Sequence, residues 1–437
     1  MSMERDTVLH SWCVQAEWDA PTIVGGEGAY FFDAAGQRYL DMSSLAECMN
    51  LGHQHPRVVR AIQEQAQKLC FVTNAWGAEP RATLAQLLLE KSGFEGGRVF
   101  FTLGGADANE HAVKFARLAS GKGQGQVITR ERSYHGASFA TMALSGDSRT
   151  ATQVKPAQFG VLRVSAPYAY RCPYGTASET ECGEAAVRHI ERTVESVGAG
   201  AVAGVLMETN AGTNGIVAPP NYWPLLRGLT ERHGIYLIAD EVMSGFGRCG
   251  EWFAWQRYGD AGRPDLMTLA KGLTGAHAPL GAVVVSAAIA ARLDKQMLYT
   301  GLTYCGHPLS CAAGVAAVRA YEDESLIERS RVLGQQLFEQ ARELQSRHAV
   351  IGDVRGGDGL FVVVELVRDR ATREPLSPWA STHPALRALV AKALTHGVSF
   401  ACRGNLLILA PPLVIEEQAL TDAVHLLDRL LANGVWS

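Results

Sequence analysis

Several features that would assign this 437-residue chain to a class of protein are scarce or missing. It contains only eight lysines against thirty-two arginines, and its formal net charge at pH 7 is −4. The isoelectric point lies near 6.4, and no basic stripe runs along the sequence. A mildly acidic chain without such a stripe argues against nucleic acid as a partner.

Cysteine pairing signals and long apolar runs are missing as well. The nine cysteines give an odd count, and no two are spaced as C-x-x-C. This pattern argues against a disulfide framework and a zinc or other metal site, and it favours a reducing compartment. The N-terminal segment lacks the apolar region of a signal peptide. The longest apolar run, 282–291, is interrupted by Ser286 and is too short for a membrane span. We therefore expect a cytoplasmic protein without a membrane partner.

Apolar residues are abundant, at 47% of the chain, so a large core can form. From about residue 99 to residue 286, short apolar segments alternate with helical patterns. This alternation predicts an α/β fold with a mostly parallel sheet and helices on both faces. The predicted strands are 98–103, 126–129, 161–164, 201–207, 235–239, 266–270 and 282–285.

The two ends of the chain read differently from this middle part. Residues 28–41 predict a hairpin that turns at Asp33-Ala-Ala-Gly36, and residues 55–69 predict a helix that opens at Pro56. Long helical stretches follow Ser310, and then strand-like pieces at 358–366 and 406–409 and a final helix at 416–432. We predict a large domain at 56–310 and a small α/β domain built from both termini, residues 1–55 and 311–437.

One lysine and one aspartate follow two of the predicted strands. Asp240 ends the run Ile235-Tyr-Leu-Ile-Ala, and Lys271 ends the run Leu266-Met-Thr-Leu-Ala. In an open α/β sheet, ligands bind outside the carboxyl ends of the strands, where both side chains would project. Lys forms a Schiff base with pyridoxal phosphate and Asp pairs with the pyridinium nitrogen, so the pair predicts this cofactor.

Each residue also has an ordinary alternative. A lysine is most often a solvated surface residue, and an aspartate after a strand is often a helix cap. Lys271 precedes Gly272, Gly275 and Gly281, where the backbone can approach a ligand closely, and this favours the site.

Three further segments carry weaker signals. Gly104-Gly105-Ala106 lies between a predicted strand and a helix, where backbone N–H groups form an anion site, although many βα turns look alike. Tyr134 follows a strand and could place its ring over a planar cofactor, with Val242 on the opposite face. Arg403 precedes the strand at 406–409 and is a candidate clamp for a substrate carboxylate, with Arg355 as the alternative.

Together these motifs resemble the class III, or omega, aminotransferases of pyridoxal-phosphate fold type I. The resemblance covers nearly the whole chain, and the order and spacing of the motifs make it specific. The motifs are Asn50-Leu-Gly-His53, Gly104-Gly-Ala-Asp-Ala-Asn-Glu110, Tyr134-His-Gly136, Asp240-Glu-Val-Met-Ser-Gly-Phe-Gly-Arg248, Lys271-Gly-Leu-Thr-Gly275, Thr303-Tyr-Cys-Gly-His-Pro308 and Pro411-Pro-Leu413.

The resemblance implies pyridoxal 5′-phosphate as cofactor and a role for each matching residue. Lys271 would be the Schiff-base lysine, Asp240 the pyridinium partner, and Tyr134 and Val242 the two sides of the ring. The remaining positions are Gly105 and Ala106 at the phosphate, Glu208 near the substrate side of the cofactor, and Thr303 at the phosphate of a neighbouring subunit. Thr303 would make a homodimer with shared active sites the active unit, with a tetramer as the larger alternative.

The sequence also departs from the family pattern, mainly around the substrate. Ala106 stands where the family often has Ser, Thr209 follows Glu208 where Pro is usual, and Met243 replaces the Gln of 4-aminobutyrate and ornithine enzymes. Glu47 stands where the amine:pyruvate branch often has an aromatic ring, and it would favour a substrate with a second cationic or hydroxyl group. We predict substrate contacts at Arg403, Glu47 and Trp76.

We therefore expect a ping-pong aminotransferase that moves an amino group from an omega-amino acid or primary amine to a 2-oxo acid, pyruvate in the nearest branch. Another fold type I reaction (aminomutase, racemase or decarboxylase) remains an alternative, because the same lysine and aspartate serve it. So does a taurine or 4-aminobutyrate transaminase. A non-catalytic binding protein is the alternative from another class, and the retained Lys271 argues against it.

Overall fold

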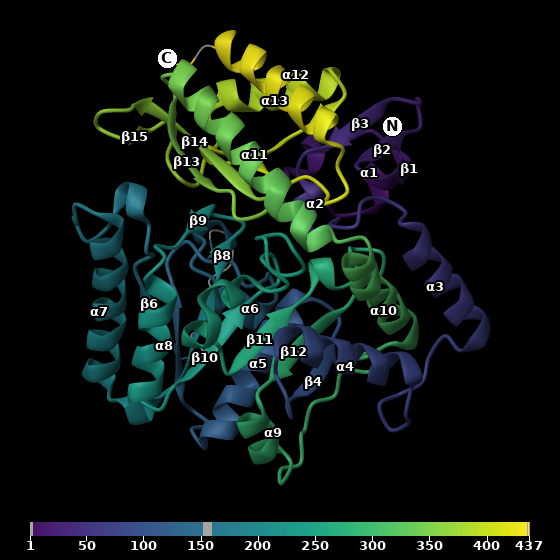
Figure 1. Cartoon of the computed structure of the whole chain (residues 1–437), viewed down its shortest axis with the longest axis vertical. Coiled ribbons are helices and arrows are strands. Elements are labelled where there is room, and N and C mark those ends of the chain that lie inside the picture. The colour runs from purple at the N-terminus through teal and green to yellow at the C-terminus, as the bar shows by residue number, and fades with distance from the viewer. Residues whose placement is uncertain (1–2, 152–159, 435, 437) are drawn as a thin grey trace.

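The structure is a computed structural model, and it describes residues 3–151, 160–434 and 436. A seven-stranded sheet in the order β4-β12-β11-β10-β7-β5-β6 forms the centre of the larger lobe (Figure 1). Its strands are β4 (Arg98–Thr102), β5 (Gln126–Arg130), β6 (Val161–Val164), β7 (Val202–Glu208), β10 (Tyr236–Asp240), β11 (Leu266–Leu269) and β12 (Gly281–Val285).

All seven strands predicted from the sequence are present, and the sheet is mostly parallel. β6, β5, β7, β10 and β11 run parallel to one another, whereas β12 is antiparallel to both β11 and β4. Every residue of β7, β11 and β12 is buried. Continuous apolar strands are expected where helices cover both faces of a sheet.

Successive side chains of one strand enter different apolar clusters, as the alternation along a strand requires. Leu237 of β10 packs in the cluster that includes Leu226, while Ile238 packs in the cluster that includes Phe115. Helices therefore cover both faces. They are α4 (Glu79–Ser92), α5 (Gly105–Ser120), α6 (Phe139–Leu144), α7 (Glu179–Val197), α8 (Tyr222–Arg232) and α9 (Ala287–Leu293).

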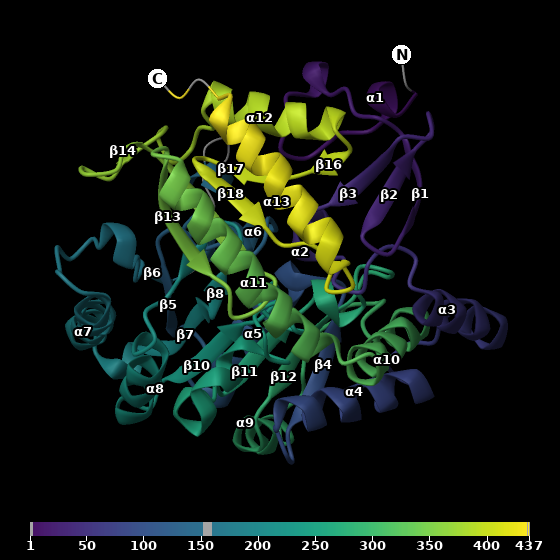
Figure 2. The same cartoon turned by 45° about the horizontal axis from the view of Figure 1, so that its top comes forward.

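A smaller lobe lies above the carboxyl ends of the parallel strands and contains both ends of the chain (Figures 1 and 2). One of its sheets has the order β13-β14-β18-β17, with β15 paired to β14. These strands are β13 (Ile351–Gly356), β14 (Val362–Asp369), β15 (Glu374–Pro375), β17 (Ala401–Arg403) and β18 (Leu406–Leu409). The helices α11 (Leu326–Arg347), α12 (Pro384–Thr395) and α13 (Glu417–Ala432) belong to the same lobe.

N-terminal and C-terminal segments share the second sheet of this lobe. The strands β1 (Ile23–Glu27), β2 (Tyr30–Asp33) and β3 (Arg38–Asp41) form the expected hairpin and its extension, and β16 (Val398–Ser399) pairs in parallel with β3. The helices α3 (Pro56–Lys68) and α10 (Pro308–Asp323) pack together beside the larger lobe. The domain limits at residues 55 and 310 stay a prediction.

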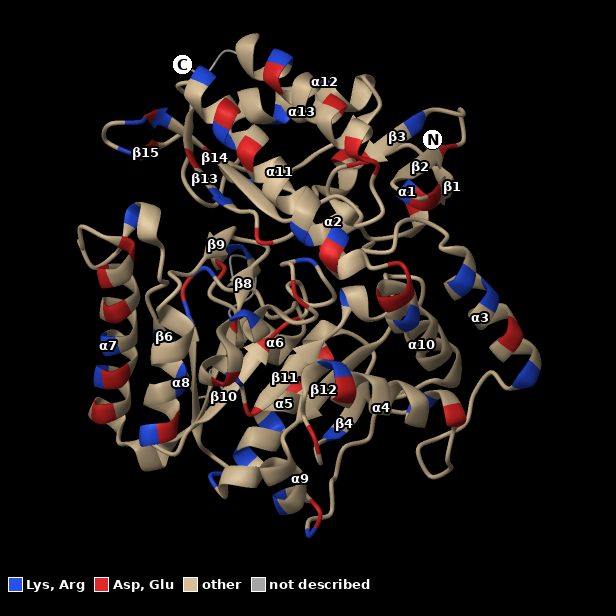
Figure 3. Ribbon diagram, viewed as in Figure 1, with Lys and Arg blue, Asp and Glu red and all other residues tan. Residues whose placement is uncertain are grey.

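Two short irregular elements lie where the lobes meet. One is the two-stranded hairpin of β8 (Asn210–Ala211) and β9 (Ile216–Val217), and the other is α2 (Ser44–Glu47). Near the N-terminus, α1 (Met3–Thr7) has no buried residue. Both acidic and basic residues occur along α7 and α11 (Figure 3). In the part of the chain that the structure describes, no helix is long and apolar enough to cross a membrane.

Candidate active site

A cavity of about 250 Å³ lies at the carboxyl ends of the parallel strands. This is the edge of an open α/β sheet at which ligands bind. Seven residues that the sequence assigned to a cofactor line it: Gly105, Ala106, Tyr134, Glu208, Asp240, Val242 and Lys271. Asn109, His135, Asn210, Thr213 and Met243 are also part of its wall.

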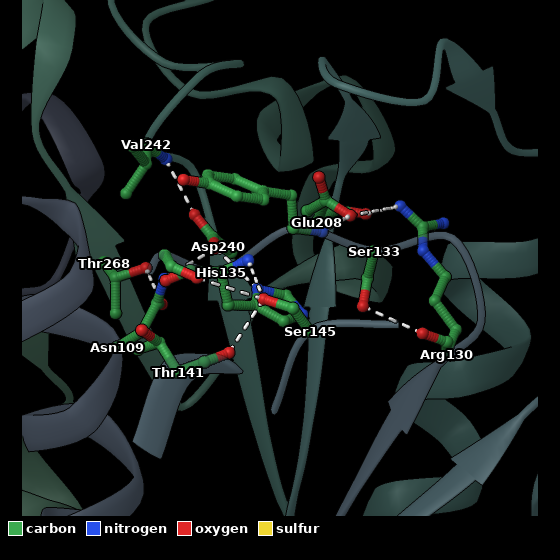
Figure 4. A network of polar contacts seen from close by, with 12 residues as sticks. Asn109, Arg130, Ser133, His135, Thr141, Ser145, Glu208, Asp240, Val242 and Thr268 are labelled. Atoms are coloured by element: carbon green, nitrogen blue, oxygen red, sulfur yellow. Dashed lines mark hydrogen bonds and ion pairs between the residues drawn. The ribbon is translucent and has the colours of Figure 1, made fainter. Parts of the chain in front are cut away.

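The carboxylate of Asp240 makes three polar contacts at the wall of this cavity (Figure 4). Its Oδ2 accepts a hydrogen bond from Asn109 Nδ2 at 2.8 Å and lies 2.7 Å from His135 Nδ1. Its Oδ1 accepts from the backbone N–H of Val242 at 3.0 Å. Since Asp240 is only 4% exposed, these three contacts fix the direction of the charge.

The register of the sheet brings the polar residues of this network together. Asp240 is paired with Glu208 of β7 on one side and with Thr268 of β11 on the other. The hydroxyl of Thr268 donates to Asn109 Oδ1 at 2.8 Å, which turns the amide of Asn109 toward Asp240. Three adjacent parallel strands thus carry polar groups at the same level, immediately below the cavity.

Glu208 forms a second buried charge in the wall. Its Oε2 lies 3.1 Å from Nη2 of Arg130, which ends β5 and is fully buried. Burial raises the pKa of Glu208, and the nearby Arg130 guanidinium only partly offsets this effect. The backbone N–H of Tyr134 donates to the same oxygen at 3.4 Å. The ion pair therefore anchors the chain segment that carries Tyr134.

The first turn of α5 opens on the cavity through Gly105 and Ala106. A Cβ atom at Gly105 would lie 2.9 Å from Cγ1 of Val242, so only glycine allows this close approach. Likewise, a Cβ at Gly136 would lie 2.6 Å from Cβ of Ala106. The N–H groups of a first helical turn have no partner within the helix and attract an anion.

On the other side of the cavity, Lys271 pairs with Glu47, and Glu47 in turn pairs with Arg403 of the smaller lobe. Nζ of Lys271 lies 3.2 Å from Oε2 of Glu47, and Nη2 of Arg403 lies 3.0 Å from Oε1 of the same carboxylate. Glu47 is 1% exposed. Burial would raise its pKa, but the charges of Arg403 and Lys271 outweigh burial and leave the pKa below its usual value. Glu47 is therefore an ionised carboxylate between two cations.

The remaining predicted positions lie away from the cavity wall. Trp76 is 70% exposed, and Thr303 is exposed in the segment before α10. Arg355, the alternative carboxylate clamp, holds Asp353 and Glu365, each at 2.7 Å from its Nη1. These two carboxylates neutralise Arg355. Arg403, in contrast, is linked to Lys271, because both pair with Glu47.

Among the residues that hold Asp240 and Glu208 in place, four had no role in the sequence interpretation: Asn109, Arg130, His135 and Thr268. Asn109 and His135 stand inside motifs that were recognised, and Thr268 lies two residues after Leu266 in a predicted strand. The periodicity of α5 carried a signal for Asn109, because it lies four residues after Gly105 on the same helix face. No comparable local pattern marks Arg130.

Comparison with known proteins agrees with this geometry. The model of the family described as aminotransferase class-III matches residues 15–431. A leucine/methionine racemase of Thermococcus litoralis is 33% identical over 95% of this chain and 91% of the racemase. A putrescine–pyruvate aminotransferase of Pseudomonas aeruginosa is 32% identical over 95% of this chain and 91% of that enzyme.

A solved structure is similar over the full fold. It is the taurine:2-oxoglutarate aminotransferase of Bifidobacterium kashiwanohense in complex with PLP and glutamate, at 36% identity and a TM-score of 0.93. The alignment covers 99% of this chain and 96% of that chain. The fold is therefore that of a fold type I transaminase. The chain belongs to the class-III aminotransferases, enzymes that depend on pyridoxal 5′-phosphate.

Proposed function

We propose that this enzyme transfers an amino group from a primary amine or omega-amino acid to a 2-oxo acid, with pyruvate as the acceptor, and works as a cytoplasmic homodimer. The observation that carries the proposal is one cavity that holds the carboxylate of Asp240 and the amine of Lys271. The putrescine–pyruvate aminotransferase among its relatives supports this pair of substrates.

The residues of the cavity fit pyridoxal phosphate. A buried carboxylate suits the ring nitrogen, a lysine amine suits the aldehyde, and the first turn of α5 suits the phosphate. The cofactor, when bound, supplies an electron sink for the substrate. Gly105 and Ala106 would bind its phosphate, and Tyr134, Val242 and Glu208 would line its ring.

Two groups of the chain would then move or hold protons. Lys271 Nζ would hold the cofactor covalently and, once free again, would take a proton from the donor carbon that bears the amine. Asp240 would pair with the protonated ring nitrogen, because its three hydrogen-bond contacts fix the carboxylate at the wall of the cavity. His135 and Asn109 hold that carboxylate in place.

The substrate contacts of the proposal come from the smaller lobe and a second subunit. Arg403 would bind the carboxylate of the 2-oxo acid, and Glu47 and Trp76 would face the amino donor. Thr303 would contact the phosphate of the cofactor in a second copy of the chain. Its exposure, and that of Trp76 at 70%, suit residues that a partner subunit covers. The small domain would comprise residues 1–55 and 311–437.

Racemisation is the second candidate, because a racemase is 33% identical to this chain. The two reactions differ in whether the amino group leaves the donor. We would incubate the holoenzyme with a panel of primary amines, diamines, omega-amino acids and taurine, with pyruvate as acceptor, and measure alanine formed. If the enzyme is a transaminase, at least one donor should give alanine, and only when pyruvate is present. Inversion of leucine or methionine without pyruvate, and no alanine from any donor, would reject it in favour of racemisation.

A further inference from the structure

Glu47 is the carboxylate that pairs with the amine of Lys271. Its Oε2 lies 3.2 Å from Nζ of Lys271, within hydrogen-bond distance. In the proposed reaction, the amine of Lys271 would leave this position when it holds the cofactor. A carboxylate within reach of that amine is within reach of an ammonium group that takes its place.

We propose that Glu47 is the anion that receives the ammonium group of the amino donor before the covalent exchange. The proposal rests on the proposed function, since it concerns the donor of that reaction. Aliphatic amines have a pKa of about 10.4 and therefore arrive protonated at neutral pH. A buried, ionised carboxylate recognises an ammonium group through a charge-assisted hydrogen bond.

The backbone that carries Glu47 adopts a conformation that local sequence does not favour. Ser44, Leu45, Ala46 and Glu47 have φ values of 48°, 43°, 73° and 59°. They form one left-handed helical turn, closed by hydrogen bonds from Glu47 N to Ser43 O and from Cys48 N to Ser44 O. None of the four is glycine. Left-handed residues of this kind normally occur singly, so the surrounding structure must impose the turn.

Two buried charges impose it. Asp41 Oδ1 accepts hydrogen bonds from the backbone N–H groups of Ser43 and Leu45 at 3.0 and 3.3 Å. Nη2 of Arg248, a fully buried guanidinium, donates to Ser44 Oγ at 2.9 Å and to Asn50 Oδ1 at 2.8 Å. Asp41 and Arg248 thus hold the turn on both sides, and the turn in this conformation positions the side chain of Glu47.

The other charges around Glu47 suit an ammonium receptor. Arg403 holds Oε1, and Arg248 adds a third positive charge near the carboxylate, so Glu47 stays ionised. Oε2 faces the one cation that the reaction moves, the amine of Lys271. When Lys271 binds the cofactor, Oε2 becomes the acceptor for the next ammonium group.

The rival interpretation gives Glu47 only the task of neutralising Arg403. The two roles differ in the half-reaction that they affect. A receptor for the donor affects binding of amines of any length, because every donor brings the reacting ammonium. A carboxylate that merely neutralises Arg403 affects binding of the 2-oxo acid, whose carboxylate competes for the same guanidinium.

The test separates the two half-reactions in the holoenzyme. Glu47→Gln keeps the size of the side chain and removes its charge, while Cys48→Ser changes the next residue of the same turn without a change of charge. We expect Glu47→Gln to raise the KM for propylamine, and for every other accepted amine, by at least about 10-fold, or ~1.4 kcal/mol. The KM for pyruvate should stay constant or fall, and Cys48→Ser should resemble the wild type. An unchanged KM for amines with a lower KM for pyruvate would overturn the proposal.

A binding measurement without the cofactor provides a second readout. Lys271→Ala removes the lysine cation that faces Oε2 of Glu47. We expect methylammonium to raise the Tm of apo Lys271→Ala and to leave that of Lys271→Ala/Glu47→Gln unchanged. An equal response of both proteins would also overturn the proposal. Because this assay needs no turnover, it decides the role of Glu47 even if no amine is transaminated, a result that would count against the proposed function instead.

Discussion

Two buried carboxylates, Asp240 and Glu47, serve one site and are held in opposite ways. Asp240 ends a regular parallel strand, and its oxygens are bound by an amide, an imidazole and a backbone N–H (Figure 4). Glu47 ends a left-handed turn, and its oxygens meet two cations. The first lies within one lobe, whereas the second joins Lys271 of the larger lobe to Arg403 of the smaller lobe.

The two carboxylates therefore differ in mobility. Asp240 with its hydrogen-bond partners is the fixed side of the site, and Glu47 with its ion pairs is the adjustable side. Asn109, one of the partners of Asp240, is itself held by Thr268, which restricts rotation of the Asp240 carboxylate. The partners of Glu47 include the one amine that the reaction releases. Ion pairs have less strict geometry than hydrogen-bonded networks, and they can exchange one cation for another.

The largest effect is expected for Lys271→Ala, because this substitution removes the reacting amine itself. Loss of a nucleophile lowers turnover by on the order of 10⁴-fold or more in other enzymes, and we expect a comparable loss of alanine formation. Borohydride reduction of the wild type followed by peptide mapping should place the pyridoxyl group on Lys271. Lys392→Ala, an exposed lysine on α12, is the control and should keep full activity. A pyridoxyl group on any other lysine would refute the assignment.

The next effect concerns the charge of Asp240. Asp240→Asn keeps the shape of the side chain but cannot hold the proton of the ring nitrogen, so the electron sink is lost. Removal of one group that stabilises a transition state electrostatically costs about 3 kcal/mol. We expect the free-energy barrier to turnover to rise by at least this amount. Cofactor affinity, measured by equilibrium dialysis, should change less, because the α5 site and Lys271 remain.

Turnover of Asp240→Asn near the wild-type level would remove the main distinction between the two carboxylates. Glu47→Gln is the matched control, as it also replaces a buried carboxylate with an amide. We expect Glu47→Gln to raise the KM for amines and Asp240→Asn to lower the maximal rate.

The two sides also differ in how well the sequence predicts them. The strands β10 and β11 are continuous apolar runs, so Asp240 and Lys271 could be placed at their ends before the structure was known. Their neighbours Thr268 and Asn109 were missed, because their hydrogen bond depends on how helix α5 packs against β11. The sequence of one strand or one helix does not encode that packing.

Less of the adjustable side could be predicted. Glu47 and Arg403 were each identified as substrate contacts, but their ion pair joins opposite ends of the chain, and no local pattern indicates it. The left-handed turn has no glycine at its four residues, so residue preferences argue against it. One of its two causes, Arg248, lies far away in the sequence.

Arg403→Ala sharpens the comparison with a smaller effect. A bidentate contact between guanidinium and carboxylate contributes about 1.5–3 kcal/mol, so we expect the KM for pyruvate to rise by roughly 10- to 100-fold. Because Arg403 also holds Glu47, the KM for a simple amine should rise as well, by only a few-fold. Arg403→Lys, which keeps the charge, should restore the amine KM more fully than the pyruvate KM. Equal losses for both substrates in Arg403→Ala would reject Arg403 as the acceptor clamp.

The smallest effect tests the strain in the turn that carries Glu47. Ala46 has φ 73° and ψ 42° and is exposed, and Ala388 is an exposed residue in the middle of the regular helix α12. Glycine in a helix is less stable than alanine by about 0.5–1 kcal/mol, because it loses more conformational freedom on folding. In a left-handed conformation, alanine itself costs roughly 1–2 kcal/mol. Ala388→Gly should therefore lower the Tm of the apo protein, whereas Ala46→Gly should leave the Tm unchanged or raise it slightly. If both variants lose stability equally, the turn is not strained, and Glu47 is placed by local preference instead of by Asp41 and Arg248.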